Sequence, residues 1–103
     1  MIINITTDNV KEFNDLIKYY SGENNDATHT GIYVGVKHAL ESLGIYQDVI
    51  HNKKETSFEL DEDKLEYLIL LIKKNSINAL WNIGLASGIC WVLEDLGLYK
   101  NIK

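Results

Sequence analysis

Histidine, cysteine and acidic side chains are the residues of this chain that could support catalysis or metal binding. His38 and Glu41 stand three positions apart, which places both on one face of a helix, a spacing that some metal sites use. The sequence contains no second pair of this kind, so we interpret His38 as solvent-facing. Cys90 has apolar neighbours and no candidate base beside it, which favours a buried, inert thiol. We therefore expect no catalytic residue, no metal site and no cofactor, and we expect that the protein is not an enzyme.

Acidic residues gather at positions 59, 61, 62 and 63. Carboxylates in the first turn of a helix are stabilised by the positive end of the helix dipole. Asp61 can also cap the free backbone N–H groups of that turn, as Thr6 or Thr7 can at an earlier helix. The acidic run therefore predicts the start of a helix. A small acidic patch that binds a basic partner is the functional alternative.

The composition indicates one globular domain for which nucleic acid is an unfavourable partner. The chain has 103 residues, 46% of them hydrophobic, which suffices for a core and argues against disorder. Its net charge is −5, and all ten basic residues are lysines, scattered among fifteen acids. Arginine, the usual bidentate reader of guanine, is absent, as is proline. The abundance of Ile, Asn, Lys and Tyr suggests AT-rich codons, and so a low-GC bacterium or one of its phages or plasmids.

The sequence favours a cytoplasmic protein without a membrane span. A single cysteine excludes an intrachain disulfide, which fits a reducing compartment. The first ten residues, MIINITTDNV, lack the basic and long apolar regions of a signal peptide. Residues 76–93 carry no charge and contain a GxxxG pattern, which some transmembrane dimers use. That run includes polar residues and is short for a span, so we expect a buried helix of a soluble protein.

An internal repeat organises the chain. Residues 35–46 read GVKHALESLGIY and residues 88–99 read GICWVLEDLGLY, with six identities in twelve positions at an offset of 53. Residues 3–20 align with residues 58–75 at an offset of 55. A small length difference in a connecting loop is what tandem duplication leaves, and two copies make a pseudo-symmetric domain and not a solenoid. We predict one domain, 1–103, with repeat one at about 1–50 and repeat two at about 56–103.

Each repeat is expected to form a short extended segment followed by two helices. Residues 3–5 and 58–60 alternate apolar and polar side chains, and we expect these segments to pair across a pseudo-two-fold axis. Apolar residues at helical spacing predict helices at about 8–20, 28 or 30–43, 61–75 and 76–96. Gly44 and Gly97 should end the second and fourth helices. The fold class is mainly α, an internally duplicated pair of helical hairpins (four helices), with a connector at 46–57 whose first residues could form a helical turn.

Four glycines recur at equivalent positions of the two repeats. Gly31 and Gly35, like Gly84 and Gly88, are four positions apart on one helix face. A glycine in a helix interior costs about 1 kcal/mol relative to alanine, so a repeated pair implies a compensating contact. We expect the second and fourth helices to cross there with their backbones close together.

The repeats differ most where polar side chains of the first are replaced by apolar ones in the second. Tyr67, Ile69, Leu70, Cys90 and Trp91 align with Glu12, Asn14, Asp15, Lys37 and His38. Positions expected to face water in repeat one are thus apolar in repeat two, and an exposed apolar patch commonly marks a partner site. We interpret these five residues of repeat two as a partner-binding surface. The alternative is that the N-terminal segment or the connector at 46–57 covers them.

These features predict a non-catalytic protein-binding module that forms a homodimer, a complex with another protein, or both. Small size, acidity and an AT-rich origin suit phage or mobile-element proteins that bind and inhibit a host factor in the host cytoplasm, such as anti-defence or anti-CRISPR proteins. A toxin or bacteriocin immunity protein, or an antitoxin, is the first alternative, since these are also often small, acidic and helical. A small nucleic-acid-binding regulator is the second, and the charge of −5 makes it unfavourable.

Overall fold

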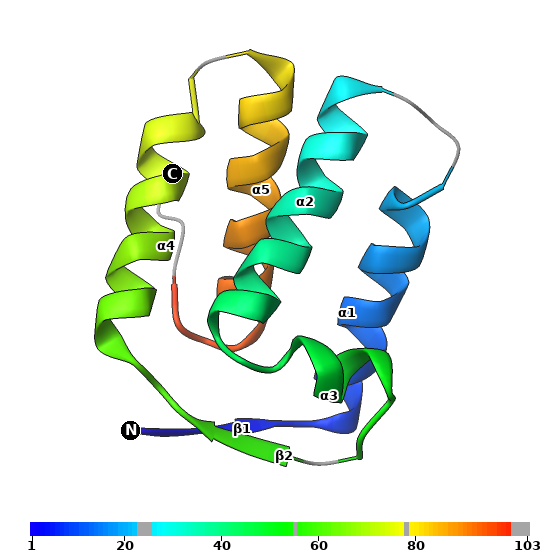
Figure 1. The fold of residues 1–103 in the computed structure, drawn as a ribbon, viewed down its shortest axis with the longest axis vertical. Coiled ribbons are helices and arrows are strands. Elements are labelled where there is room, and N and C mark those ends of the chain that lie inside the picture. Colours follow the sequence, from blue (N-terminus) through cyan, green and yellow to red (C-terminus); the bar gives the residue numbers. More distant parts are fainter. Residues whose placement is uncertain (23–25, 55, 78, 100–103) are drawn as a thin grey trace.

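The fold is mainly helical, as predicted, with a small sheet at one end (Figure 1). The computed structural model describes residues 1–22, 26–54, 56–77 and 79–99. In chain order the elements are β1 (Ile2–Ile5), α1 (Thr7–Tyr20), α2 (Ala27–Ser42), α3 (Tyr46–Ile50), β2 (Thr56–Glu59), α4 (Glu62–Asn75) and α5 (Leu80–Asp95). Helices α1 and α2 form one antiparallel pair, α4 and α5 form another, and α2 packs against α5 in the middle.

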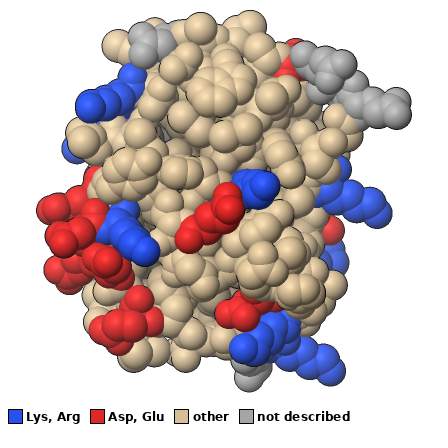
Figure 2. All heavy atoms as spheres, in the orientation of Figure 1, with Lys and Arg blue, Asp and Glu red and all other residues tan. Residues whose placement is uncertain are grey.

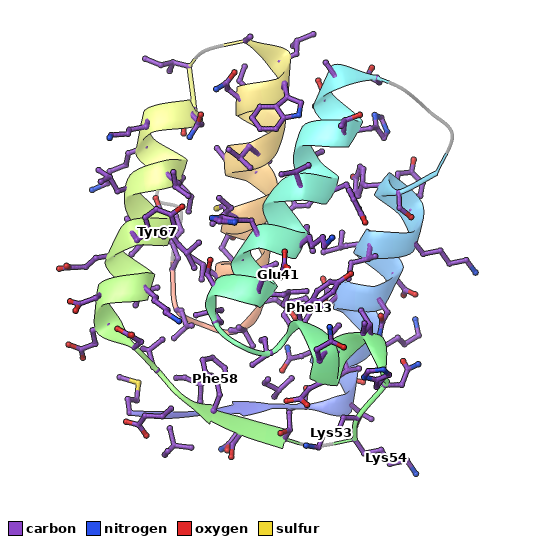
Figure 3. All side chains as sticks on the ribbon, viewed as in Figure 1. Phe13, Glu41, Lys53, Lys54, Phe58 and Tyr67 are labelled. Atoms are coloured by element: carbon purple, nitrogen blue, oxygen red, sulfur yellow. The ribbon has the colours of Figure 1, made fainter. Side chains whose placement is uncertain are left out.

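Strands β1 and β2 form a two-stranded antiparallel sheet, which confirms that the two extended segments pair. Ile3 lies opposite Phe58, and Ile5 lies opposite Thr56. The second strand begins two residues earlier than predicted because Thr56 continues the ladder to Ile5. Ile3 and Ile5 are buried, and Phe58 packs partly buried against the core, pointing toward the helices (Figure 3). One face of the sheet therefore closes the end of the helical layer.

A short fifth helix, α3, forms the first residues of the connector, where the sequence allows a helical turn, so that possibility is confirmed while the count of four helices is one too few. Val49 is fully buried and fixes α3 on the core. The Asn14 amide of α1 donates hydrogen bonds to the Val49 carbonyl oxygen at 2.7 Å and to Asn52 Oδ1 at 3.0 Å. Packing and these hydrogen bonds stabilise a helix too short to persist alone.

The predicted caps are present at the first helix of each half. The Thr6 hydroxyl accepts a hydrogen bond from the Asn9 backbone N–H at 3.1 Å, and Asn9 Oδ1 accepts one from the Thr6 N–H at 3.0 Å. Asp61 Oδ1 accepts a hydrogen bond from the Asp63 N–H at 3.0 Å. The acidic run therefore begins α4, and its carboxylates gather on the exposed surface at the start of this helix (Figure 2).

The boundary between the last two helices differs from the prediction, which placed a helix from residue 76. Ser76 is instead the C-cap of α4, and its hydroxyl donates a hydrogen bond to the Ile72 carbonyl oxygen. Helix α5 begins four residues later, at Leu80, and Ala79 at its N-cap makes no side-chain hydrogen bond. The hydroxyl of Ser76 is bonded back to the preceding turn, so this residue caps the end of α4 and does not start the next helix.

Gly44 and Gly97 end α2 and α5 in the left-handed conformation, as predicted, with φ of 78° and 73°. The Gly44 N–H donates to the Glu41 carbonyl oxygen, and the Ile45 N–H donates to that of Leu40. At the end of α5 the Gly97 N–H donates to the Glu94 carbonyl oxygen, and the Leu98 N–H donates to that of Leu93. This is the Schellman arrangement, in which a left-handed residue lets the chain reverse while the last carbonyl groups remain paired.

We expect Gly44→Ala to lower the free energy of unfolding by about 1 kcal/mol, because a Cβ strains the left-handed backbone. The added Cβ meets no atom within 4 Å, so strain and not collision is responsible. Urea unfolding measures the change. Gly44→Asn is the control: asparagine tolerates this conformation, and its cost should be smaller. An alanine variant as stable as the native chain would contradict the account.

Helices α2 and α5 run parallel and cross at four glycines. A Cβ added at Gly31 would lie 3.1 Å from the Cα of Gly84 and would collide with the Trp81 carbonyl oxygen. One turn later, a Cβ on Gly88 would lie 2.8 Å from the Val36 backbone nitrogen. The atoms met in each case belong to the backbone of the other helix. The missing side chains therefore let the two backbones touch, and the two helix pairs are joined along this line.

Candidate partner-binding surface

Two apolar side chains of α4 that the sequence singles out are exposed. Leu70 is 50% exposed and Tyr67 is also exposed, whereas their neighbour Leu68 is fully buried. The Tyr67 hydroxyl lies 3.0 Å from His38 Nε2, so Tyr67 projects toward α2 (Figure 3). Ile69 is half-buried and packs against the core. His38, predicted to face solvent, is half-buried because Tyr67 packs against its ring at a centroid distance of 5.7 Å.

Trp91 lies on the outer side of α5 and is 38% exposed. Its ring centroid is 5.9 Å from that of Tyr20, which comes from α1. The five residues proposed from the sequence are therefore divided between two places. Tyr67 adjoins α2, while Trp91 adjoins α1 and has Cys90 buried beside it.

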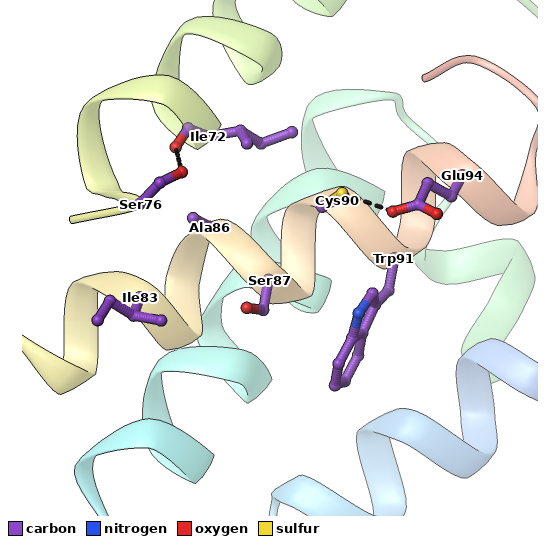
Figure 4. A pocket seen from close by; sticks show the side chains of 8 residues that line it. All are labelled: Ile72, Ser76, Ile83, Ala86, Ser87, Cys90, Trp91 and Glu94. Carbon is purple, nitrogen blue, oxygen red and sulfur yellow. Dashed lines mark hydrogen bonds between the residues drawn. The ribbon is translucent and has the colours of Figure 1, made fainter. Parts of the chain in front are cut away.

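A pocket of about 140 Å³ opens between α4 and α5 next to Trp91 (Figure 4). Its walls include Ile72 and Ser76 of α4, and Ala86, Cys90, Trp91 and Glu94 of α5. Ala86 and Cys90 are small, and the residues aligned with them in the first half of the chain are larger. Ala86 aligns with Tyr33, and Cys90 aligns with Lys37, whose ammonium lies 5.6 Å from the centre of the Tyr46 ring. Larger side chains occupy these positions in the first half of the chain.

Cys90 is buried, as predicted, and its thiol is bonded within the pocket. The Sγ–H donates a hydrogen bond to Glu94 Oε1 at 2.7 Å (Figure 4). Burial, together with the hydrogen bond to Glu94 and the negative charge of that carboxylate, raises the pKa of the Cys90 thiol to about 12. A thiol with this pKa is protonated at neutral pH and is a poor nucleophile.

We expect Cys90 in the folded protein to react with an aryl disulfide reagent at about pH 8 roughly a hundredfold more slowly than in the urea-unfolded chain. The raised pKa favours the protonated folded state, so this stabilisation should be lost as the pH rises from about 8.5, the unfolded value, to about 12. The Cys90→Ala variant should lose less of its free energy of unfolding over this pH range, because it has no thiol to ionise. Equal labelling rates in the two states would show that the thiol is neither buried nor protonated.

An acidic group lies on the α1 side of Trp91. Glu12, Glu94 and Asp95 form a second pocket with the tryptophan. A hydrogen bond shared with Asp95, together with the negative charge of that carboxylate, raises the pKa of Glu12. Asp95 also accepts a hydrogen bond from the Asn9 amide at 2.8 Å. The sequence reasoning missed this group, because its members come from opposite ends of the chain.

A third apolar feature, at the turn between α4 and α5, was missed by the sequence reasoning. Ile77 is 87% exposed, and Leu80 and Trp81 are also exposed. The same comparison between the two halves could have found it: Leu80 and Trp81 align with Ala27 and Thr28. We define the α4–α5 surface as these three separate features of one helix pair taken together, with the exposed large apolar side chains Tyr67, Leu70, Ile77, Leu80, Trp81 and Trp91.

The described part of the chain contains no group of three or more His, Cys, Asp and Glu side chains that could hold a metal ion. Within residues 1–22, 26–54, 56–77 and 79–99, no polar or charged side chain is fully buried. None of the helices seen in these segments is long and apolar enough to cross a membrane. Comparison with protein-family models, curated proteins and solved structures finds no match to this chain.

Proposed function

We propose that this chain is a non-catalytic protein-binding module that docks a partner on its α4–α5 surface. The observation that carries the proposal is that six of the nine exposed large apolar side chains among the described residues lie on α4, on α5 or at the turn between them, whereas α1 exposes Tyr19 alone and α2 exposes none. Tryptophan, tyrosine and leucine side chains that remain in water lose contact with water when a partner binds, and Trp and Tyr are frequent binding hot spots.

We further propose that the partner is a host protein and that the chain inhibits it, as phage and mobile-element proteins do in the cytoplasm of their host. The small size, the charge of −5 and the arginine-free composition support this class. The acidic surface is unfavourable for nucleic acid, because a phosphate backbone carries the same sign of charge. If the captured partner is a toxin or bacteriocin, the chain belongs instead among immunity proteins and antitoxins.

We also propose that the two halves arose by duplication of one strand–helix–helix unit. The contacts between the halves support this origin. Gly31 lies against Gly84, Gly35 lies against Gly88, and Ile3 lies opposite Phe58. Each of the three pairs joins positions that are equivalent in the sequence alignment, and self-pairing of equivalent positions is what a two-fold axis requires.

Affinity capture from host cells, with light scattering for self-association, tests the binding proposal. The double variant Leu70→Asp/Trp91→Ala should keep its helical circular dichroism and lose the captured protein or the associated mass. Ile2→Ala/Gln47→Asp is the matched control, since it also truncates one exposed apolar side chain and adds one acid, at other exposed positions. Equal capture by both variants would refute the proposal, and unfolding of the first would show that these side chains belong to the core.

A further inference from the structure

Strand β2 pairs with β1 on one side, and its other edge is unpaired in the part of the chain that the structure describes. The Leu60 N–H donates to the Met1 carbonyl oxygen at 2.9 Å. In an antiparallel ladder every second residue bonds to the neighbouring strand, so the N–H and C=O groups of Ser57 and Glu59 point away from β1. Among the described residues none forms a hydrogen bond with these backbone groups. An edge of this kind is a template for another strand.

The charges at the two ends of β2 have opposite signs. Lys53 and Lys54 lie just before the strand, where the chain enters it (Figure 3). Glu62 and Asp63 are exposed just after it, in the first turn of α4. The lysine end remains net positive even with Glu55, which lies outside the described residues. A strand with this pattern is complementary to an antiparallel copy of itself, because reversal brings each end beside the opposite end.

We propose that a second copy of this chain pairs with the free edge of β2, antiparallel, about a two-fold axis at Phe58. In this register the outward backbone groups of Ser57 meet those of Glu59 in the second copy, with two hydrogen bonds on each side of the axis. Lys54 then lies opposite Glu62 of the second copy, and the symmetry repeats this contact. The product is a single sheet, in the order β1–β2–β2–β1, that continues from one molecule into the other.

Three observations favour a second copy at this edge over the edge of β1. Strand β1 carries no charged side chain, so its free edge offers no charge complementarity. Among the described residues, Lys54 and Glu62 make no ion pair within the chain, so both are available to the second copy. The carboxylate of Glu59, which would lie near the axis, is already paired with the N-terminal ammonium at 2.9 Å, and this reduces its repulsion from its symmetry mate.

The dimer is expected to be weak, because each copy contributes one short strand of four residues. Such an interface is far smaller than the standard one of about 1,600 Å², and we expect a dissociation constant on the order of 100 µM. Sedimentation equilibrium in low salt, at chain concentrations from about 10 µM to about 1 mM, measures it.

Proline at the two edges of the sheet tests which edge pairs. Ser57→Pro removes an outward N–H at the centre of the proposed contact and no hydrogen bond to β1, and proline is tolerated at such edge positions. Asn4→Pro is the matched control, since Asn4 lies opposite Ser57 and its N–H points from the other edge of the same sheet. We expect Ser57→Pro to weaken self-association at least about tenfold and Asn4→Pro to keep the native dissociation constant, with unchanged circular dichroism in both.

Reversal of charge tests the register without altering the backbone. Lys54→Glu and Glu62→Lys each place like charges opposite one another at both symmetry-related contacts. Each variant alone should associate about fivefold more weakly than the native chain in low salt. An equimolar mixture should recover the native affinity, because a dimer with one molecule of each variant has opposite charges at both contacts.

A native chain that remains monomeric at about 1 mM would overturn the inference, as would equal association of the Ser57→Pro and Asn4→Pro variants. Failure of the mixed charge variants to recover affinity would also overturn it, and these variants decide the question if Ser57→Pro does not fold. The variant Leu70→Asp/Trp91→Ala should keep the dimer, since its changes lie on the α4–α5 surface. Loss of self-association in that variant would place the contact on the α4–α5 surface and refute pairing at β2, without deciding whether that surface binds a host protein.

Discussion

Gly88→Ala should destabilise the protein by about 3 kcal/mol or more, against a typical total of about 5–15 kcal/mol. The added Cβ would lie 2.8 Å from the Val36 nitrogen and 3.2 Å from the Gly35 carbonyl carbon, and it would collide with the Ile32 carbonyl oxygen. These are backbone atoms of α2, so relief requires the two helices to move apart. That movement would open the contact on which both halves of the core depend.

The sign of this effect is informative. In an exposed helix, replacing glycine by alanine stabilises by about 1 kcal/mol, which is opposite to the change expected here. Gly22→Ala is the control for an added Cβ with room around it: Gly22 lies outside the helices, just after the C-cap of α1, and the Cβ meets one atom, the Tyr19 carbonyl oxygen, at an ordinary 3.7 Å. Urea unfolding monitored by circular dichroism compares the two. A Gly88→Ala variant that is more stable than the native chain would contradict the close crossing of α2 and α5.

Phe13→Ala should cost about 3–5 kcal/mol, the range for truncating a buried aromatic side chain. Phe13 is completely buried, and it comes from α1, which packs against α2 and α3 (Figure 3). Removing the ring leaves a cavity among side chains that cannot fully collapse into it, and it weakens the attachment of the first helix. The urea midpoint should fall without a change in the far-ultraviolet spectrum of the folded state.

Tyr19→Ala on the same helix is the control for this substitution. Tyr19 is 70% exposed, and its ring contacts are with Tyr20 and His29. Its truncation should therefore cost less than about 1 kcal/mol. Similar losses for Phe13→Ala and Tyr19→Ala would show that α1 does not bury the face that the fold assigns to it.

Most elements of the fold could be predicted because their signals are local. Thr6 and Asp61 cap helices through their own side chains, and Gly44 and Gly97 end them through left-handed backbone conformations. The elements that differ depend on contacts distant in sequence. Helix α3 persists because Val49 is buried and Asn14 of α1 bonds to its end, and neither contact is visible in a window of residues 46–57.

The candidate surface was predictable only in part, because a comparison of aligned positions does not show which side chains the fold buries. Comparing aligned positions identified Tyr67, Leu70 and Trp91, which the structure leaves exposed. The comparison also proposed Cys90, which is buried. An apolar residue that replaces a polar one can be either exposed or buried, so the comparison alone could not separate Cys90 from the others. The acidic group beside Trp91 was not predictable, since Glu12 and Asp95 meet only after the chain has folded.

The central claim is that the α4–α5 surface binds a protein, and photo-cross-linking in host cells tests it most directly. A photoreactive amino acid replaces Trp91 or Leu70 in separate variants, and replaces the exposed Gln47 of α3 in the control. We expect both surface variants to cross-link to the same host protein on illumination and the Gln47 variant to yield no such adduct. Cross-links of equal strength from Gln47, or none from either surface position in folded protein, would contradict the claim.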